Sequence, residues 1–414
     1  MIDKDLVIVG GGAGGLSAAI SAYNNGIKDI LILEREDHLG GILHQCIHNG
    51  FGLTKFKEEL TGPEYAYRHI KEVEKLGIEY KLDTQVLNIS KDKVVTYSNP
   101  VDGLVDVKAK AIVIATGSYE RTPGAIMLPG DRVAGITTAG TAQKICNITG
   151  FITGKRIVIL GSGDIGLIMA RRLTLEGAKV ICVAEIMPYS NGLQRNIVQC
   201  LEDYNIPLYL STTVSNVIGK KRVEKVVLSK VDEKLQIIPN TEMEIECDCL
   251  VLSVGLIPQT TLFDNLEVNY GNNRGAKVDE NLMTEVPGIF TCGNALHIHD
   301  LVDFVSEEGD IAGKGAAEFL KNNIHESNKI TLTNGDGVGY VVPNFVNKDS
   351  VGPVNVKFRV RKPHKTAVLR IKSGDNIILK RPLLGPVPSV MFNIPLTMDK
   401  IKDFDNIEVA VTDE

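Results

Sequence analysis

The sequence predicts the α/β fold class, with two doubly wound three-layer domains, the second inserted in the first, and a small C-terminal β module. Three observations lead to this prediction. An apolar strand, a glycine-rich turn, a helix and a strand ending in an acid occupy residues 6–34 and recur at 156–185. Apolar strands at 250–254 and 289–292 then return the chain to the two sheets. After residue 331, apolar and polar residues alternate as in antiparallel strands.

These elements divide the chain into three parts. We expect the first domain to comprise residues 1–118 and 258–328, the inserted domain residues 119–257, and the β module residues 331–414. A chain of 414 residues suits two or three domains, and a hydrophobic fraction of 43% can supply several cores.

The composition excludes several classes of partner. The net charge is −6, the basic residues are dispersed, and tryptophan is absent, so we expect no nucleic-acid partner. The seven cysteines are scattered and do not resemble a disulfide framework, which indicates a reducing compartment. The first apolar run is a short strand that leads into glycines, so we expect no signal peptide and no membrane span. The expected location is therefore the cytoplasm.

The first glycine turn has the features of a Rossmann-like dinucleotide site. Gly10, Gly12 and Gly15 form the G-x-G-x-x-G pattern between a strand and a helix. The first glycine permits a tight turn, the second lets a diphosphate approach, and the third lets helix and strand pack closely. The helix N-terminus offers free N–H groups to the phosphates. Glu34 ends the second strand, where a carboxylate can hold ribose hydroxyls.

The second glycine turn repeats the pattern with Gly161, Gly163 and Gly166, and Glu185 ends its second strand. Glu185 also bears on the choice of cofactor. Two unit charges about 4 Å apart repel by ~4 kcal/mol at an effective dielectric constant near ~20, so a carboxylate here opposes the 2′-phosphate of NADP. No arginine directly follows Glu185 to receive that phosphate. We therefore predict NAD(H) in the inserted domain.

Three further segments give the chain a family resemblance. IVIATGSYERTP lies between the two glycine motifs, and LVLSVGLIPQT and then TEVPGIFTCGNALHIHDLVDFVSEEG follow the second. With them, residues 5–325 resemble the two-dinucleotide-binding-domain flavoproteins of the pyridine nucleotide-disulfide oxidoreductase superfamily. The resemblance implies FAD in the first domain, NAD(H) in the second, and hydride transfer between the two.

The resemblance also implies which residues contact the cofactors. Asn294 stands where the family has an aspartate, so an acceptor oxygen is kept and a charge is lost. The residues expected at the FAD are Gly10, Gly12, Ala13, Gly14, Gly15, Glu34, Arg35, Gly41, Val86, Ala115, Thr116, Gly117, Gly293 and Asn294. Those expected at the NAD are Gly161, Gly163, Asp164, Ile165, Gly166, Glu185 and Gly255.

Within the superfamily, the segment GGILHQCIHNGFGL and the β tail resemble one subgroup. These proteins are NAD/FAD subunits of multi-subunit flavin dehydrogenases, such as the oxidoreductase that accompanies FAD-linked glycerol-3-phosphate dehydrogenase. The resemblance implies electron transfer between NAD(H) and a partner dehydrogenase subunit, a small electron-transfer protein or another acceptor, within a homo- or hetero-oligomer. The direction of electron flow stays open. The β module could dock that partner, cover the FAD domain or form a homodimer.

Cys46 supports an alternative function. Dithiol reductases of the family carry two cysteines after the Gly-Gly that follows the first acid, whereas here only Cys46 follows Gly40-Gly41. At a helix start beside the flavin, its thiolate could serve a free-standing NADH-dependent reductase of thiols, disulfides or peroxides. Cys46 could also be a small residue packed beside the flavin ring. A third hypothesis is a non-enzymatic scaffold that keeps the folds alone.

Histidines and acids near these motifs suggest further sites. His44, Cys46 and His48 could share one face of a strand, but a metal site needs three or four convergent ligands. We therefore predict no metal site, and expect these residues, with His297 and His299, to lie at the flavin pocket. The sequence leaves open whether four carboxylates touch the flavin end or form a solvated helix face: Asp300, Asp303, Glu307 and Glu308.

Overall fold

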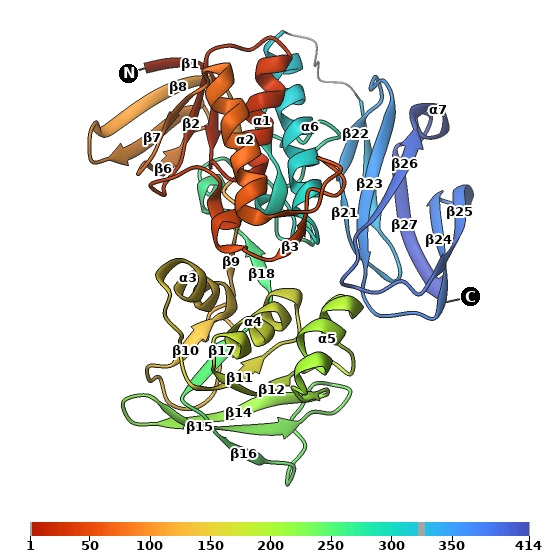
Figure 1. Ribbon diagram of the computed structural model, residues 1–414. Helices are drawn as coiled ribbons and strands as arrows, with labels where there is room; N and C mark the ends of the chain where they lie inside the picture. The colour runs from red at the N-terminus through yellow and green to blue at the C-terminus, as the bar shows by residue number, and fades with distance from the viewer. Residues whose placement is uncertain (1, 322–327, 414) are drawn as a thin grey trace. The chain divides into compact units, whose positions relative to one another are not determined.

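The computed structural model describes residues 2–321 and 328–413, and the chain divides into two compact units. The first unit comprises Met1–Ser118 and Pro258–Glu414, and the second comprises Tyr119–Ile257. The chain leaves the first unit along strand β9 (Ser118–Glu120) and returns along β18 (Leu256–Pro258) (Figure 1). Among the described residues, no helix is both long and apolar enough to cross a membrane.

A seven-stranded sheet organises the first unit. Its order is β5-β2-β1-β8-β7-β6, and β19 also pairs with β8. The strands β5, β2, β1, β8 and β19 run parallel, while β6, β7 and the first half of β8 form an antiparallel meander. The strand bounds are β1 (Ile2–Val9), β2 (Ile30–Leu33), β5 (Glu79–Lys81), β6 (Gln85–Ile89), β7 (Val94–Asn99), β8 (Gly103–Ile114) and β19 (Ile289–Thr291).

Helices α1 (Ala13–Asn24), α2 (Gly62–Leu76) and α6 (Val302–Leu320) lie side by side on one face of this sheet (Figure 1). Alternate strand residues divide between two cores: Leu6 and Ile8 face the helices, whereas Val7 and Val9 face the meander side. Short elements complete this part: η1 (Gly41–Gln45), β3 (Asn49–Phe51), β4 (Leu60–Thr61), η3 (Thr261–Phe263) and η4 (Gly293–Ala295).

The second unit has its own parallel sheet, in the order β10-β17-β11-β12-β13. Helices cover one face, and a three-stranded antiparallel sheet, β14-β15-β16, covers the other. The bounds are β10 (Ile136–Thr138), α3 (Ala139–Thr149), β11 (Arg156–Leu160), α4 (Asp164–Leu175), β12 (Lys179–Ala184), α5 (Gln194–Cys200), η2 (Glu202–Tyr204), β13 (Leu208–Tyr209), β14 (Thr212–Gly219), β15 (Val223–Lys230), β16 (Met243–Glu246) and β17 (Cys249–Leu252). Both units therefore have the predicted α/β class.

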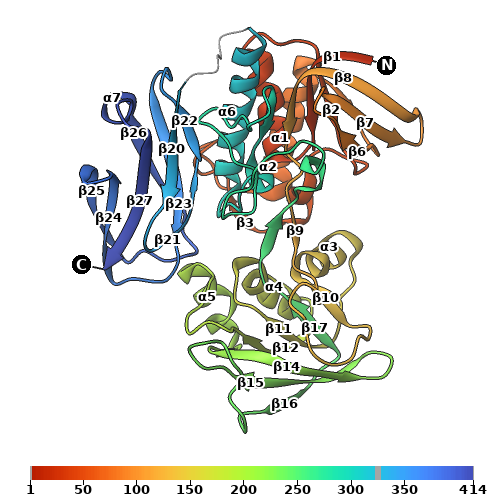
Figure 2. The same cartoon turned by 180° about the vertical axis from the view of Figure 1, so that it is seen from behind.

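The C-terminal β module consists of two sheets that share one core (Figure 2). Their orders are β22-β20-β27-β24-β25 and β21-β23-β26. The bounds are β20 (Lys329–Asn334), β21 (Val338–Val342), β22 (Phe345–Asn347), β23 (Pro353–Val360), β24 (Thr366–Ser373), β25 (Asn376–Leu384), β26 (Phe392–Thr397), α7 (Met398–Ile401) and β27 (Asn406–Asp413). The module belongs to the first unit, and the expected boundary at 328–331 adjoins residues 322–327, which lie outside the described range.

Polar contacts tie the module to the rest of the first unit. Asn347 on β22 donates to Asp279 Oδ2 at 3.2 Å, and its backbone N–H donates to Glu280 Oε2 at 3.1 Å. Val342 packs in the same core as helices α1 and α6. The module is therefore integrated with the nucleotide-binding part of the unit.

Because Asp279 is buried, we predict that the stability of the folded chain depends on pH. Burial and the neighbouring Glu280 raise the pKa of Asp279 to about 7. An unfolded aspartate titrates near ~3.9, so between these values the folded chain holds a proton that the unfolded chain has released. The stability from this proton is complete below about pH 4 and is lost as the pH rises through about 7. We expect thermal melting of the wild type to fall between about pH 5.5 and about pH 8.5 by more than melting of Asp279→Asn.

The matched control is Asp375→Asn, which removes a carboxylate of the same type from an exposed turn of the module. This variant should keep the wild-type dependence of melting temperature on pH. Equal pH slopes for Asp279→Asn and the wild type would show that Asp279 does not hold the proton.

Candidate functional site

The first glycine turn joins the end of β1 to the start of α1. Gly10 has a φ of 106°, and a Cβ there would lie 2.5 Å from the carbonyl oxygen of Ala115. A Cβ on Gly15 would overlap the carbonyl oxygen of Gly10. Both positions therefore require glycine, because any side chain would push the strand end and the helix apart.

Gly12 tests whether this turn fits a diphosphate. It is the N-cap of α1, no side chain caps the helix, and the first turn contains no acid. A Cβ on Gly12 would meet nothing within 4 Å. Open space thus lies beside uncapped helix N–H groups and the positive end of the helix dipole, which suits a phosphate. Gly41 lies against this turn, since its Cβ would be 3.2 Å from the Gly12 Cα.

Glu34 is a buried carboxylate that braces the same turn. Its Oε2 accepts the N–H of Gly11 at 2.6 Å, and its Oε1 accepts the N–H of Glu36 at 2.9 Å. The charge is thereby held at the end of β2, beside the glycine turn. The neighbouring Arg35 side chain is largely exposed and lies 3.7 Å from Glu36, while Val86 is buried on β6.

The second unit repeats this geometry. Gly161 has a φ of 99°, and a Cβ there would overlap the carbonyl oxygen of Ser253. Glu185 is 4% exposed, and its Oε2 accepts both the N–H and the hydroxyl of Ser162 at 2.9 and 2.7 Å. The N–H of Met187 donates to its Oε1 at 2.9 Å. Glu185 is therefore placed against its glycine turn as Glu34 is placed against the first.

Helix α4 begins differently from α1. Asp164 is its first residue, and its Oδ1 accepts the N–H of Leu193 at 2.8 Å and the amide of Asn196 at 2.7 Å. Its side chain is thus tied to helix α5. Gly163 is the N-cap without a side-chain bond, and Ile165 and Gly166 follow Asp164 in the first turn. Gly255 has a φ of 104°, and a Cβ there would meet nothing within 4 Å.

The Ala115-Thr116-Gly117 segment lies directly on the first glycine turn. The N–H of Ala115 donates to the carbonyl of Val9 at 2.8 Å, and the Thr116 hydroxyl donates to the carbonyl of Gln259 at 3.2 Å. Gly117 has a φ of 75° and open space at its Cβ position. The structure thus brings this segment to the strand end where the sequence placed the first nucleotide.

The loop that begins at Gly293 is bonded to Glu308 of helix α6, a carboxylate whose role the sequence left open. Asn294 accepts the N–H of His299 at its Oδ1, at 3.0 Å. The N–H of Gly293 instead donates to Glu308 Oε2 on helix α6, at 2.9 Å. A buried acid from the helix therefore holds the start of this loop.

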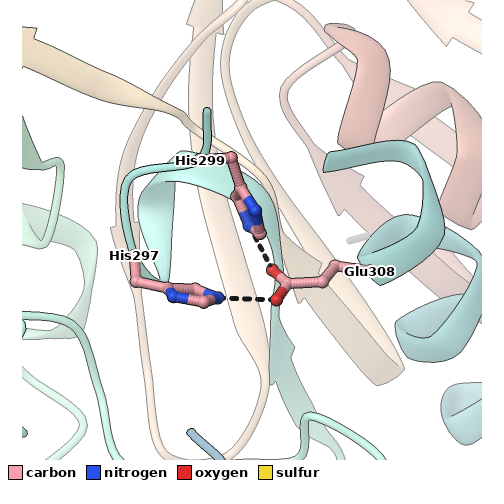
Figure 3. Close-up of side chains that lie close together, drawn as sticks. All are labelled: His297, His299 and Glu308. Carbon is pink, nitrogen blue, oxygen red and sulfur yellow. Dashed lines mark hydrogen bonds and ion pairs between the residues drawn. The ribbon is translucent and has the colours of Figure 1, made fainter. Parts of the chain in front are cut away.

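Glu308 is the centre of a cluster with His297 and His299, and the three side chains are at most 1% exposed (Figure 3). His297 Nε2 lies 2.6 Å from its Oε1, His299 Nε2 lies 2.9 Å from its Oε2, and Lys357 Nζ lies 3.0 Å from its Oε1. Although burial opposes its charge, the two histidines and Lys357 hold the pKa of Glu308 well below its usual range. Burial lowers the pKa of His299 to about 4.

These three side chains also form a group that could hold a metal ion, with ligand atoms within 4.8 Å of one another. The chemistry of the site favours another interpretation. Lys357 places an ammonium 3.0 Å from the Glu308 carboxylate, where a metal would need to bind. A second cation there would be strongly repelled in a buried site. We therefore interpret the cluster as a hydrogen-bonded ion pair, and the prediction that the chain has no metal site still stands as a prediction.

Cys46 follows the last residue of the η1 turn as its C-cap and packs against Gly62 at the start of α2. Its Sγ donates to the carbonyl of Ile42 at 3.4 Å, and burial raises the pKa of the thiol to about 12. The carbonyl of Cys46 accepts the N–H of Gly62, the first residue of α2, at 2.9 Å. The expectation that His44, Cys46 and His48 alternate on a strand is wrong, because His44 belongs to η1 and its Nε2 lies 2.6 Å from the carbonyl of Leu39.

The four carboxylates that the sequence left open have different roles. Asp303 is buried and accepts the N–H groups of Gly52 and Thr54 at 3.1 and 2.7 Å. Asp300 pairs with Arg359 of the β module. Only Glu307 is substantially exposed, with 38% of its side chain accessible. The solvated-face interpretation therefore applies to Glu307 alone.

Lys357 and Arg359 were not among the expected site residues. They occupy the polar positions of β23, between the core residues Val356, Phe358 and Val360. In sequence, such a pattern is typical of a strand with one solvated face. The face is buried here because the loop at Gly293 and helix α6 pack on it, which no local pattern reveals.

Comparisons with known proteins agree with this geometry. The pyridine nucleotide-disulphide oxidoreductase family model matches residues 4–337. The glutamate synthase [NADPH] small chain of Halomonas elongata is 25% identical over 345 residues, covering 77% of this chain and 68% of that protein. A thioredoxin reductase of Listeria monocytogenes is 26% identical over 329 residues, covering 77% and 94%. The crystal structure of T. acidophilum thioredoxin reductase has a TM-score of 0.62 at 24% identity, covering 78% of this chain and 99% of that chain.

Gly12→Asp gives opposite expectations for folding and for nucleotide binding. Aspartate is a favoured N-cap, so the melting temperature of the nucleotide-free protein should stay level or rise slightly. The new carboxylate would occupy the diphosphate space, and charge repulsion should weaken FAD binding at least about a hundredfold. Absorbance titration of the nucleotide-free protein with FAD measures the effect.

Gly163→Asp is the matched control, since Gly163 is the equivalent N-cap in the second unit. It should bind FAD with wild-type affinity and lose affinity for NADH. Unchanged FAD affinity in Gly12→Asp would mean that the first turn does not hold the diphosphate.

Proposed function

The chain belongs to the pyridine nucleotide-disulphide oxidoreductase family and is a flavin-dependent oxidoreductase, and from this premise we propose that it passes electrons between NAD(H) and a partner protein. The observation that carries the proposal is the repeated site: two glycine turns at strand ends, each braced by a buried glutamate. One turn would hold FAD and the other NAD(H). Bound flavin and nicotinamide supply the redox chemistry, which belongs to the cofactors.

This chain's own residues would bind and orient the two nucleotides. The N-terminal N–H groups of α1 and α4 would bind the diphosphates, and Glu34 and Glu185 would hold ribose hydroxyls. Both carboxylates already accept backbone N–H groups, so they are held rigidly before any ligand arrives. Hydride transfer needs no acid or base on the protein, so the two turns need only bind and orient the nucleotides.

Preference for NAD(H) over NADP(H) is supported by Glu185. Its buried charge at the end of β12 opposes a 2′-phosphate. Pro188 and Tyr189 follow in the next loop, where NADP-binding chains need a cation to receive that phosphate. The name of the related glutamate synthase small chain specifies NADPH, so that relative does not support a preference for NAD(H). The proposed preference therefore rests on Glu185.

A partner as electron acceptor is supported by the cysteines. The sequence has no Cys-x-x-Cys pair, and the single Cys46 thiol has a raised pKa that keeps it protonated near neutral pH. The chain therefore lacks the closely spaced pair of reactive cysteines that an internal dithiol shuttle requires. One relative is the small chain of a larger enzyme, which suits a subunit that exchanges electrons with a dehydrogenase subunit or a small electron-transfer protein.

Anaerobic titration of the purified yellow protein tests the proposal. NADH should bleach the flavin at concentrations about ten- to a hundredfold lower than NADPH, because only NADPH places a phosphate against Glu185. Equal bleaching by both would overturn the cofactor preference alone. A protein that holds no flavin, or whose flavin is unchanged by either nucleotide, would overturn the proposed function.

A second candidate is a free-standing thiol or disulfide reductase, which the thioredoxin reductase relative favours. Cys46→Ser separates the two. We expect the variant to reduce a dye with NADH at the wild-type rate, and any reduction of a small disulfide to be equally unaffected, because the raised pKa of the half-buried Cys46 thiol makes it a poor nucleophile. Loss of disulfide reduction with dye reduction intact would instead identify Cys46 as the nucleophile.

A further inference from the structure

The loop from Gly293 to Asp300 is held on one side by helix α6. Glu308 accepts the N–H of Gly293 and lies within hydrogen-bond distance of both loop histidines. Gly309 and Gly313, which follow Glu308 on the same helix, let α6 approach α1, because a Cβ on either would overlap backbone carbonyls of α1. The backbone contact between the helices therefore sets where the Glu308 carboxylate lies.

The β module holds the other side of the loop through Arg359. All five N–H groups of its guanidinium have acceptors. Two reach the loop, at the Ile298 carbonyl at 2.9 Å and at Asp300. The others bond to module oxygens: Tyr340 Oη at 3.2 Å, the Pro388 carbonyl at 3.0 Å and the Ser389 carbonyl at 2.7 Å. Arg359 thus joins the loop to its own strand β23 and to two further segments of the module, at Tyr340 and at Pro388-Ser389.

A chain of hydrogen-bonded groups connects Arg359 to Glu308. Arg359 Nε–H donates to Tyr340 Oη at 3.2 Å, and Tyr340 Oη lies 3.2 Å from His297 Nδ1. His297 Nε2 lies 2.6 Å from Glu308 Oε1. The module therefore also contacts a histidine in the loop through Tyr340.

Lys357 supplies the counter-charge. It is 4% exposed, and its ammonium lies 3.0 Å from Glu308 Oε1 and 4.0 Å from Glu307. The two titratable groups that face Glu308 from the loop are His297 and His299, and from the module only Lys357 reaches it among the described residues. Without Lys357, the buried carboxylate would lose its one permanent cation.

We propose that the C-terminal β module contributes to the flavin site, because Lys357 and Arg359 are positioning residues for the Gly293–Asp300 loop. Lys357 acts through Glu308 and the Gly293 N–H, and Arg359 acts directly on Ile298 and Asp300. The inference rests on the proposed function, because the loop is the segment expected to hold the flavin. In this arrangement, FAD affinity depends on the charges of Lys357 and Arg359, which lie outside both glycine motifs.

Lys357→Met tests the inference by removing the ammonium while keeping an unbranched chain. We expect FAD to bind at least about tenfold more weakly, because the Glu308 carboxylate is left uncompensated and the loop loses its fixed position. The bound flavin should also show a shifted midpoint potential and visible spectrum, which a loss of global stability alone would not produce. Lys357→Arg, which retains the cation, should recover most of the affinity.

The matched control is Lys372→Met, which breaks an ion pair with Glu408 in the same module at a half-exposed site. This variant should bind FAD as the wild type does. The double variant Lys357→Met with Glu308→Gln should bind FAD better than either single variant, because it removes both charges together. The inference would be overturned if Lys357→Met had the same FAD affinity and spectrum as Lys372→Met. It would also be overturned if the effects of the two substitutions on FAD affinity were additive in the double variant.

Arg359→Lys keeps the test informative if Lys357→Met does not fold. A lysine can make at most three of the five bonds, so the loop loses contacts while the charge remains. FAD affinity should again fall at least about tenfold. Wild-type affinity in this variant would overturn the inference while leaving the proposed function intact, whereas a wild-type protein without flavin would overturn the proposed function first.

Discussion

The structure depends on backbone contacts at the ends of two parallel strands, where a Cβ would not fit. In the first unit, Gly15 lies on the Gly10 carbonyl and Gly10 lies on the Ala115 carbonyl. In the second, Gly161 and Gly166 both lie against Ser253. These contacts let a helix begin immediately beside the sheet edge. In both units, uncapped helix N–H groups therefore lie at this edge of the sheet, where a diphosphate would bind in the proposed function.

Buried carboxylates connect these turns to the rest of each unit. Glu34 and Glu185 accept N–H groups from the turn and from the residue two positions on, so their charges are stabilised by the backbone. The same bonds keep the oxygens at the strand end, beside the turn. Each of these glutamates thus supports the local fold, and in the proposed function its remaining lone pairs would accept ribose hydroxyls.

Glu308 follows a different arrangement, since its permanent counter-charge comes from a distant part of the chain. The contact between α6 and α1 brings it under the Gly293 loop, and β23 brings Lys357 to it. A buried carboxylate with neutral donors alone would be costly, so the module and the loop depend on each other. Arg359, which bonds both to the loop and to the module, and the contacts of Asn347 and Val342 add to this connection within the first unit.

The sequence alone determined the α/β class, the two glycine turns and the acids that follow them, because these signals are local and lie within one strand–helix–strand unit. The Thr61–Glu64 capping box of α2 is equally local and could have been found from sequence. The position of Cys46 at the end of η1 could not, since it depends on positive φ angles at Gly40 and Gly41. Only the tertiary structure decided the cluster around Glu308. Lys357 lies far from it in sequence on a strand whose polar face reads as solvated, and packing against α6 is what buries that face and makes the ion pair.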